Sequence, residues 1–452
     1  MTLATERLEA TRKRLAEIVG PTGVLVDDQA AAFSAHGEAP VAVALPTEEG
    51  QVAEVARLAS AEGVPVVAWG SGTKQDIEPV QPREGIVLGL GQLNGTLELD
   101  AANLTVTVGA GKVVDDLQRE LAEVKLFLPL DPVDSARATI GGTLATNSSG
   151  PNRLLYRTAR DMVLGLRVVT PTGDVIRVGG KTVKDVAGYD MKKLYIGSWG
   201  TLGAITAATF RLLPLPEASA TVVMVFPQLS SGCSMVSDIL ASFMRPSTAE
   251  LVSYGAMPAP VQEVFSLRSG EYLLLVQVEG AVEAVERQKR ELAELAGKNG
   301  AREVSPLEKG EEKELWSYRK EVFGTLPADA AAMVMKGSVL LKRVGDFTGA
   351  LMSMQEQGLQ TSFASHAGNG IVYALLAAEP GGEEKLISAA GRLQQVATQC
   401  GGFALVQKAP RSVVEKVRLW PPRDDYGLMR EIKAQLDPNN LWNPARIPGG
   451  RV

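Results

Sequence analysis

The first 217 residues alternate short helical and extended patterns of hydrophobic positions. A helix is predicted over residues 5–19, and a second begins at Glu48, where apolar residues recur every three or four positions. A third is predicted over residues 113–123, and a hairpin over residues 162–178. Short apolar runs bounded by turn residues predict strands over residues 39–45, 64–68, 86–88, 96–99 and 105–108.

Residues 131–160 follow neither the helical nor the extended period. They contain many Gly, Ser, Thr and Asn residues and no sustained apolar pattern. Long stretches without secondary structure are uncommon inside a compact protein unless they serve a function. We therefore expect this segment to wrap around a ligand.

The pattern changes after Arg211, where prolines interrupt the chain. Strands predicted over residues 221–226, 272–278 and 370–376 alternate with helices, which indicates a second α+β domain. The charge run of the helix predicted over residues 282–295 is interpreted as the solvated face of that helix. No repeat of fixed period is visible in the sequence.

Composition narrows the class of protein. The 46 Lys and Arg against 52 Asp and Glu give a net charge of −6, which argues against nucleic acid as a partner. Two cysteines, Cys233 and Cys400, are too few for an iron–sulfur cluster or a disulfide framework, so we expect a cytoplasmic protein. No run reaches the 18 or so apolar residues of a membrane span, so any membrane association would come through a partner.

Three glycine-rich segments carry the strongest chemical signal: residues 70–74 (GSGTK), 139–150 (TIGGTLATNSSG) and 197–206 (GSWGTLGAIT). Glycine lets successive backbone N–H groups approach an anion, and the hydroxyl and amide groups of the second segment suit a pyrophosphate and ribose. Residues 89–95 approach the dinucleotide-binding fingerprint, but their spacing is one residue too long. A nicotinamide cofactor is therefore disfavoured.

In this order and at these separations, the three segments resemble the FAD-binding motifs of the vanillyl-alcohol oxidase/para-cresol methylhydroxylase (PCMH) family. Residues 181–190 (KTVKDVAGYD) and the ending at 436–444 are similar to flavin-binding subunits of bacterial glycolate oxidases, in the D-2-hydroxy-acid dehydrogenase group. The resemblance implies an α+β fold, in which a PCMH-type FAD-binding domain of two α+β subdomains precedes a C-terminal α+β, ferredoxin-like cap. The domains expected are a helical segment (1–35), the FAD domain (36–217), the substrate or cap domain (218–410) and a tail returning to the flavin (411–452).

The same resemblance implies which residues hold FAD. Family members that link FAD covalently do so through a histidine in the first loop; residues 69–75 contain none, so we expect non-covalent FAD. The implied cofactor residues are Trp69, Gly70, Ser71, Gly72, Thr73, Lys74, Asp131, Thr139, Gly141, Gly142, Thr146, Asn147, Gly150, Gly200, Thr201, Gly203, Ile205 and Asn443.

Two histidines are available for acid–base chemistry. His36 is interpreted as a surface loop residue, and His366 precedes a Gly-Asn-Gly turn. A near-neutral pKa suits histidine as a general base, although a purely structural histidine is the alternative for His366. In the family, the matching motif has two histidines, and a later Glu-His, that serve a divalent metal and the base. Here Tyr373 takes the second histidine's position, and Gln407 and Lys408 take that of the Glu-His, so we expect no metal site.

Arg319 and Lys336 match the positions at which family dehydrogenases bind the substrate carboxylate. A guanidinium or ammonium group suits this task, although each residue taken alone is more commonly a surface cation. Two functions follow. In one, the chain oxidises a 2-hydroxy acid such as glycolate or D-lactate, with His366 as base. In the other, it is a flavin-carrying electron-transfer or scaffold subunit beside a catalytic paralogue. The resemblance implies an iron–sulfur partner subunit in either case.

Overall fold

The computed structural model describes residues 3–34, 40–75, 85–181, 189–307, 309–321, 323, 326–327, 330–444 and 446. The chain divides into two compact units. Unit 1 is Met1–Ser148, Thr158–Leu215 and Pro422–Val452; unit 2 is Ser149–Arg157 and Pro216–Pro421. His36 and residues 182–188, which carried part of the sequence argument, lie outside the described residues.

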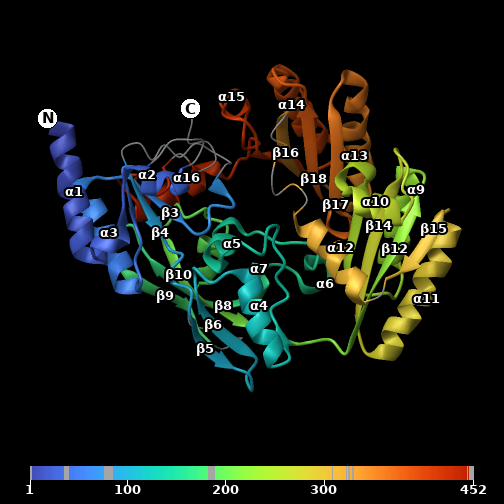
Figure 1. Cartoon of the computed structure of the whole chain (residues 1–452), viewed down its shortest axis with the longest axis horizontal. Coiled ribbons are helices and arrows are strands. Elements are labelled where there is room, and N and C mark those ends of the chain that lie inside the picture. The colour runs from blue at the N-terminus through green and yellow to red at the C-terminus, as the bar shows by residue number, and fades with distance from the viewer. Residues whose placement is uncertain are drawn as a thin grey trace. The chain divides into compact units, whose positions relative to one another are not determined.

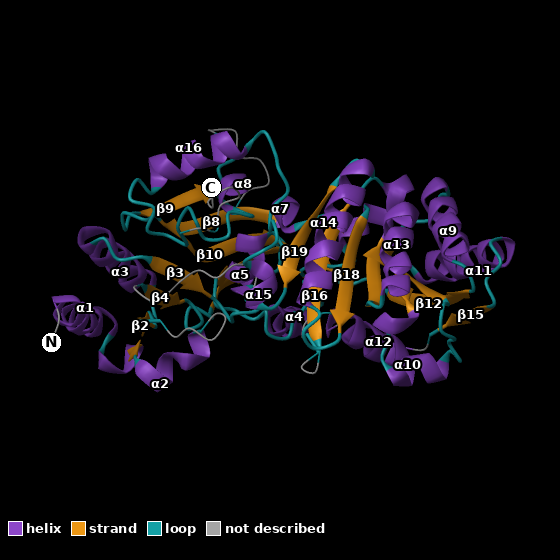
Figure 2. Ribbon diagram, turned by 90° about the horizontal axis from the view of Figure 1, so that it is seen from above, coloured by secondary structure: helices purple, strands orange, loops and turns teal. Residues whose placement is uncertain are grey.

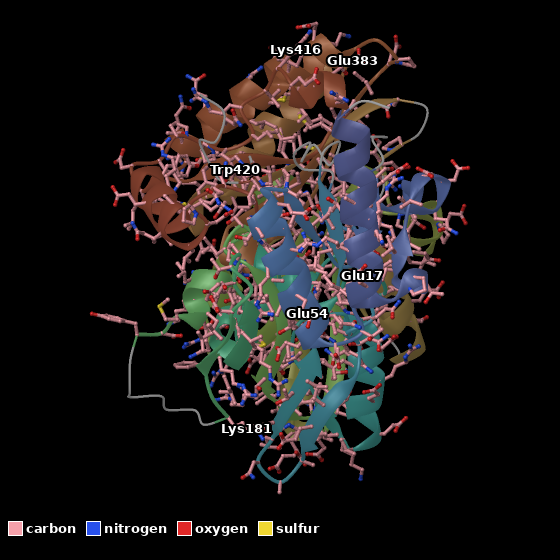
Figure 3. The ribbon with its side chains drawn as sticks, turned by 90° about the vertical axis from the view of Figure 1, so that its left-hand side faces the viewer. Glu17, Glu54, Lys181, Glu383, Lys416 and Trp420 are labelled. Carbon is pink, nitrogen blue, oxygen red and sulfur yellow. The ribbon has the colours of Figure 1, made fainter. Side chains whose placement is uncertain are left out.

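The first sheet of unit 1 has four strands in the order β1 (Val24–Leu25), β2 (Ala42–Ala44), β4 (Ile86–Gly89), β3 (Val66–Trp69). Strands β2, β4 and β3 are parallel. Helices α1 (Leu3–Val19) and α3 (Glu49–Glu62) bury Leu15, Val52 and Val55 against one face of this sheet. Figure 3 shows the two helices side by side, with the labelled, exposed Glu17 and Glu54 on them. The short α2 (Asp27–Ala30) contributes Ala30 to the opposite face.

The second sheet of unit 1 is antiparallel and has five strands (Figure 1). Helices α4 (Val114–Glu123), α7 (Ala159–Met162) and α8 (Lys192–Tyr195) also belong to this unit, and β7 (Leu126–Phe127) pairs with β11 (Leu213–Pro214). The five strands, in spatial order, are β5 (Thr96–Asp100), β6 (Thr105–Gly109), β10 (Ala204–Arg211), β8 (Val163–Val169) and β9 (Val175–Gly179).

The segment at 131–160 is more regular than its composition predicts. It contains α5 (Ile140–Thr146), α6 (Arg153–Tyr156) and α7. The Thr139 side chain caps α5 by accepting a hydrogen bond from the Gly142 N–H (3.3 Å). Gly and Thr, which have low helix propensity, make up four of the seven residues of α5. Helices α6 and α7 have four residues each, too few for a sequence pattern to show a helical period.

Unit 2 is built on one eight-stranded antiparallel sheet. Its strands follow the order β15-β12-β14-β13-β17-β18-β16-β19. Their bounds are β12 (Ala218–Phe226), β13 (Pro246–Ser253), β14 (Tyr272–Gly280), β15 (Glu303–Pro306), β16 (Ala331–Ser338), β17 (Gln360–His366), β18 (Ile371–Ala378) and β19 (Phe403–Lys408).

Helices cover both faces of this sheet, as Figure 2 shows. On one face, a large core joins the sheet to α9 (Leu229–Ala241), α11 (Val282–Lys298), α13 (Val344–Met352) and α14 (Glu383–Gln399). On the other face, α10 (Ala259–Val264) and α12 (Lys309–Glu321) pack over a smaller apolar cluster. The short α15 (Arg411–Val414) packs on α14. The predicted α+β class is confirmed.

The eight strands form two ferredoxin-like halves. Each half has the element order βαββαβ: β12-α9-β13-β14-α11-β15, and then β16-α13-β17-β18-α14-β19. Both halves have the spatial order fourth-first-third-second, and they join where β13 pairs with β17. The sequence shows no period here because each half keeps the fold through different residues. The absence of a visible repeat in the sequence was therefore misleading.

The C-terminal tail belongs to unit 1. Helix α16 (Tyr426–Leu436) is followed by an extended segment in which Trp442 forms a parallel bridge to Val66 of β3. Lys433, 4% exposed, donates hydrogen bonds to the carbonyl oxygens of Thr201 (2.6 Å) and Trp442 (2.7 Å), and also to the Asp437 carboxylate. Among the helices of the described chain, none is both long and apolar enough to cross a membrane.

Candidate functional site

The three glycine segments meet in one cleft of unit 1, the cofactor cleft. Its empty volume is about 670 Å³, a figure that includes space open to solvent. All but four of the predicted cofactor residues line it. Asp131, Asn147, Gly150 and Thr201 do not, and their role stays a prediction. The lining consists of Ala68, Trp69, Gly70, Ser71, Gly72, Thr73, Lys74, Gln75, Leu90, Ala110, Thr139, Gly141, Gly142, Ala145, Thr146, Trp199, Gly200, Gly203, Ala204, Ile205, Asn443 and Arg446.

The first glycine loop follows β3 directly and forms one wall of the cleft. The backbone N–H groups of residues 70–73 have no acceptor among the described residues. A side chain at Gly70 would collide with Thr139 Oγ1, and a Cβ at Gly72 would lie 2.8 Å from the Trp69 ring, at a φ of +78°. Unpaired N–H groups on consecutive residues suit a bound anion, and glycine allows the close approach.

The third glycine segment is held to the first by the tail. Asn443 accepts a hydrogen bond from the Ala68 N–H (3.1 Å) and donates one to the Trp199 carbonyl oxygen (2.7 Å). Gly200 has a φ of +70°, and a Cβ there would collide with the Asn443 amide. Asn443 therefore positions two walls of the cleft as well as lining it.

The charged side chains among the described lining residues are cations. Lys74 and Arg446 line the cleft, and none of the described lining residues is an aspartate or glutamate. Arg446 also donates to the side-chain oxygen of Gln75 and to its carbonyl oxygen (3.3 Å). Two cations and a row of free N–H groups fit the diphosphate of a dinucleotide cofactor. No sequence motif pointed to Arg446, which lies two residues beyond the ending at 436–444 that contains Asn443.

A second group of polar residues, the histidine site, lies in unit 2: Glu250, Arg319, Lys336, His366 and Tyr373. Glu250 on β13 and His366 on β17 are directly paired across the junction of the two ferredoxin-like halves. Tyr373 on β18 pairs with Lys336 on β16. Because side chains alternate along a strand, all four of these side chains point to the sheet face that carries α10 and α12.

Glu250 is completely buried, and each of its oxygens has a charged or polar partner. Oε1 contacts His366 Nδ1, and Oε2 accepts a hydrogen bond from Arg319 Nε (2.6 Å) and contacts Nη2. Arg319, on α12, is only 2% exposed. Its guanidinium is therefore held by Glu250, which changes the role we propose for it. The sequence analysis did not find Glu250, a single carboxylate in an otherwise apolar and small-residue strand.

The electrostatics of this pair fix the state of the imidazole. Burial lowers the pKa of His366, and the charges of Arg319 and Lys336 lower it further, while Glu250 opposes this. Burial acts to raise the pKa of Glu250, but Arg319 and His366 hold it below its ordinary value. At neutral pH the carboxylate is thus ionised and the imidazole neutral. A carboxylate can only accept, so Nδ1–H donates to Glu250 and Nε2 carries the lone pair.

Nε2 of His366 is buried and has no hydrogen-bond partner among the described residues. Tyr373 lies beside the ring, with centroids 5.4 Å apart, and Lys336 Nζ is 5.6 Å from the centroid of the Tyr373 ring. Lys336 makes no ion pair within the described part of the chain. A buried polar atom without a partner is costly, and such atoms in native proteins often mark a catalytic role or a bound ligand.

No group of three or more His, Cys, Asp and Glu side chains among the described residues is arranged to hold a metal ion. The expectation of a metal-free site remains a prediction.

Comparisons with known proteins define the class. Residues 40–179 match the FAD binding domain family, and residues 215–404 and 417–447 match the C-terminal domain of FAD linked oxidases. The chain belongs to the family of FAD-linked oxidases and is an FAD-dependent oxidoreductase, as the three glycine segments predicted. The cofactor cleft described above fits FAD on its own observations, the free N–H groups and the two cations.

Two relatives and one solved structure show which proteins the chain is similar to. The chain is 29% identical to glycolate oxidase subunit GlcD of Bacillus subtilis over 423 residues, which cover 90% of this chain and 89% of the relative. It is 30% identical to the D-lactate dehydrogenase of Archaeoglobus fulgidus over 412 residues, 90% of each protein. The solved structure of p-cresol methylhydroxylase shares the fold, with a TM-score of 0.77 over 98% of this chain and 97% of that one, at 17% identity.

Proposed function

We propose that this chain oxidises a small 2-hydroxy acid, of the glycolate or D-lactate type, to the 2-oxo acid and passes the electrons to a partner protein. The observation that carries the proposal is the buried, unpartnered Nε2 of a neutral His366. The relatives named glycolate oxidase subunit and D-lactate dehydrogenase support the substrate class.

His366 acts as the general base in this account. Its Nε2 lone pair takes the proton of the C2 hydroxyl, and the C2–O bond becomes a carbonyl as the C2 hydrogen leaves with its electron pair. FAD, when bound, supplies the two-electron acceptor for that hydride. A positioned base of this kind contributes roughly 10²–10⁴-fold to a rate.

Lys336 binds the substrate carboxylate in this account. It is the cation of the histidine site without an ion pair within the described residues, whereas the guanidinium of Arg319 is held by Glu250. An ammonium–carboxylate contact in a buried setting contributes about 1.5–3 kcal/mol. We therefore assign Arg319 to the support of Glu250 and Lys336 to the substrate.

A second candidate is an accessory flavin subunit that transfers electrons beside a catalytic paralogue, with an iron–sulfur protein as acceptor. It is favoured by Tyr373, Gln407 and Lys408, which stand where the resembled dehydrogenases have metal-binding and basic residues. Glutamine cannot act as a general base, and a tyrosine hydroxyl does so only with a lowered pKa.

The test is anaerobic reduction of the bound flavin in the purified full chain. Glycolate and D-lactate are added separately, with acetate and propionate as controls that lack the hydroxyl group. Loss of the visible flavin absorption with a hydroxy acid, and appearance of the matching 2-oxo acid, supports catalysis by this chain. If none of the acids reduces the flavin, the proposal is wrong and the accessory role is favoured.

A further inference from the structure

The feature that the proposed reaction does not by itself explain is the complete burial of Glu250. Every residue of β13 is buried, and Glu250 is 0% exposed. Taking an ionised carboxylate out of water costs several kcal/mol unless it is paired and hydrogen-bonded. Arg319 satisfies one oxygen, and the other oxygen is directed at His366 Nδ1.

We propose that Glu250 is the positioning residue of the base: held ionised by Arg319, it accepts the Nδ1–H of His366 and so keeps the Nε2 lone pair for the substrate. This inference rests on the proposed function, in which His366 is the base. Three side chains are then in contact in sequence: Arg319 on α12, Glu250 on β13 and His366 on β17.

The contacts of Glu250 and Tyr373 restrict the imidazole of His366 in two ways. Ring rotation is limited because Nδ1 is held by a carboxylate on the paired residue of the neighbouring strand, while Tyr373 packs against the ring edge. The tautomer is fixed because an ionised carboxylate has no proton to donate. A neutral imidazole with Nδ1 bonded to an amide donor would instead carry its proton on Nε2 and could not act as a base. In serine proteases, the corresponding carboxylate-to-amide change lowers kcat about 10⁴-fold through the wrong tautomer.

The groups that face the imidazole come from every neighbouring element: Glu250 on β13, Arg319 on α12, Lys336 on β16 and Tyr373 on β18. Of these, Glu250 alone is negative. Its loss therefore removes the one charge among the described residues that favours protonation of His366, so the acid limb of a pH profile should move to lower pH.

The tautomer of His366 can be measured directly, because the protein contains only two histidines. In a His36→Gln background, ¹⁵N-histidine labelling leaves the His366 imidazole as the only signal. We expect a neutral ring protonated on Nδ1 at pH 7 in the otherwise native protein. In Glu250→Gln, we expect the proton to move to Nε2, wholly or in large part. An Nδ1–H signal that persists in Glu250→Gln would overturn the inference.

A matched control separates this effect from the loss of any buried ion pair. Glu271 is 7% exposed and accepts hydrogen bonds from Arg302 Nε (3.0 Å) and Nη2 (3.1 Å) in the same unit, without a histidine partner. Glu271→Gln should leave the His366 tautomer unchanged. If Glu250→Gln does not fold because Arg319 keeps an uncompensated charge, the double variant Glu250→Leu/Arg319→Met removes both charges and the acceptor of Nδ1–H, and the preference for protonation on Nδ1 should be lost there too.

Kinetics supply the second readout. With an oxidisable hydroxy acid, Glu250→Gln should lower kcat roughly 10²–10⁴-fold with little change in KM. A merely structural role would instead reduce the amount of folded protein and leave kcat per folded chain unchanged. If no hydroxy acid is oxidised by the native chain, the proposed function fails while the tautomer measurement still decides the role of Glu250.

Discussion

Lys336 differs from Arg319 in what surrounds its charge. Its Nζ lies over the Tyr373 ring and makes no ion pair within the described residues, whereas the Arg319 guanidinium is bound by a buried carboxylate. A half-buried cation without an ion-pair partner is able to bind an anion. This difference is why the carboxylate of the substrate is assigned to Lys336.

Lys336→Met should raise the KM for the hydroxy acid about ten- to a hundredfold, because a charge-assisted contact of about 1.5–3 kcal/mol is lost. The value of kcat should change much less, since the base is intact. Initial-rate measurements over a range of acid concentrations test this. Lys342→Met is the control, since Lys342 is exposed on the same unit; equal effects from both variants would argue against the assignment.

Gly142 tests the cofactor cleft at the level of one residue. Gly142→Asp should yield folded protein with little FAD, because a carboxylate about 4 Å from a phosphate costs on the order of 4 kcal/mol, or roughly a thousandfold in Kd. The FAD-to-protein ratio after purification is the measurement. Gly391→Asp makes the same change at an exposed helical glycine with open space around it, and it should retain FAD. Full FAD occupancy in Gly142→Asp would contradict the site.

The residues that the sequence predicted and those that it missed differ in the range of their contacts. The glycine loops are local signals, because glycine itself marks positions such as Gly72 and Gly200 where the backbone takes a positive φ. Glu250 gains its meaning from Arg319 and His366, which lie 69 and 116 residues away along the chain. No pattern within β13 distinguishes it from a solvent-exposed strand carboxylate, so only the folded structure reveals its role.

At the scale of elements, the helix α16 and the extended tail determine how the cofactor cleft is held. Lys433 has three acceptors for its three N–H bonds, and the Asp437 carboxylate also accepts from the Trp442 N–H (2.8 Å). Burial lowers the pKa of Lys433, while Asp437 opposes this. The tail therefore folds around a buried ion pair, and this fold places Asn443 between the first and third glycine segments.

Lys433→Met should lower the apparent Tm by about 5–10 °C, because Asp437 is left buried without its counter-ion. It should also weaken FAD retention, since the Thr201 carbonyl loses its link to the tail. Thermal unfolding and FAD content measure both effects. Lys416→Met is the control: Lys416 makes an exposed ion pair with Glu384 (2.6 Å), and Figure 3 shows it at the surface. A stable, FAD-replete Lys433→Met protein would contradict this account of the tail.

Elements also show why part of the fold was predictable and part was not. The helical period of apolar residues identified α3, whose Val52 and Val55 pack on the first sheet, and α4 and α11 were also predicted as helices. The glycine-rich α5 gave no period, and the β10 strand, which begins inside the third glycine segment, was not predicted. The two ferredoxin-like halves share a topology without a shared sequence pattern. The repeat is therefore visible only in the strand pairing, and the halves join through a long-range pair, β13 with β17.

At the scale of the whole molecule, the two candidate sites lie in different units. Unit 1 carries the cofactor cleft, and unit 2 carries the histidine site. FAD is the redox group of this family, and we propose that His366 and Lys336 of unit 2 serve as the base and the substrate-binding cation. Both sites are needed for oxidation of a hydroxy acid, whereas an accessory subunit would need the first alone.

The flavin should be released intact when the protein is denatured. Among the described residues that line the cofactor cleft there is no histidine, cysteine or tyrosine to form a covalent bond to FAD. Acid precipitation should therefore leave all the yellow colour in the supernatant, with FAD identified by chromatography. Flavin that remains with the protein pellet would show a covalent link and contradict this prediction.

The most direct test of the central claim is the rate of flavin reduction in a single anaerobic turnover, with native protein and His366→Gln mixed separately with D-lactate or glycolate. Glutamine keeps a polar side chain but cannot take the hydroxyl proton. The account predicts that His366→Gln binds FAD normally and reduces it roughly 10²–10⁴-fold more slowly than the native chain. Reduction at the native rate in His366→Gln would show that His366 is not the base and would contradict the account.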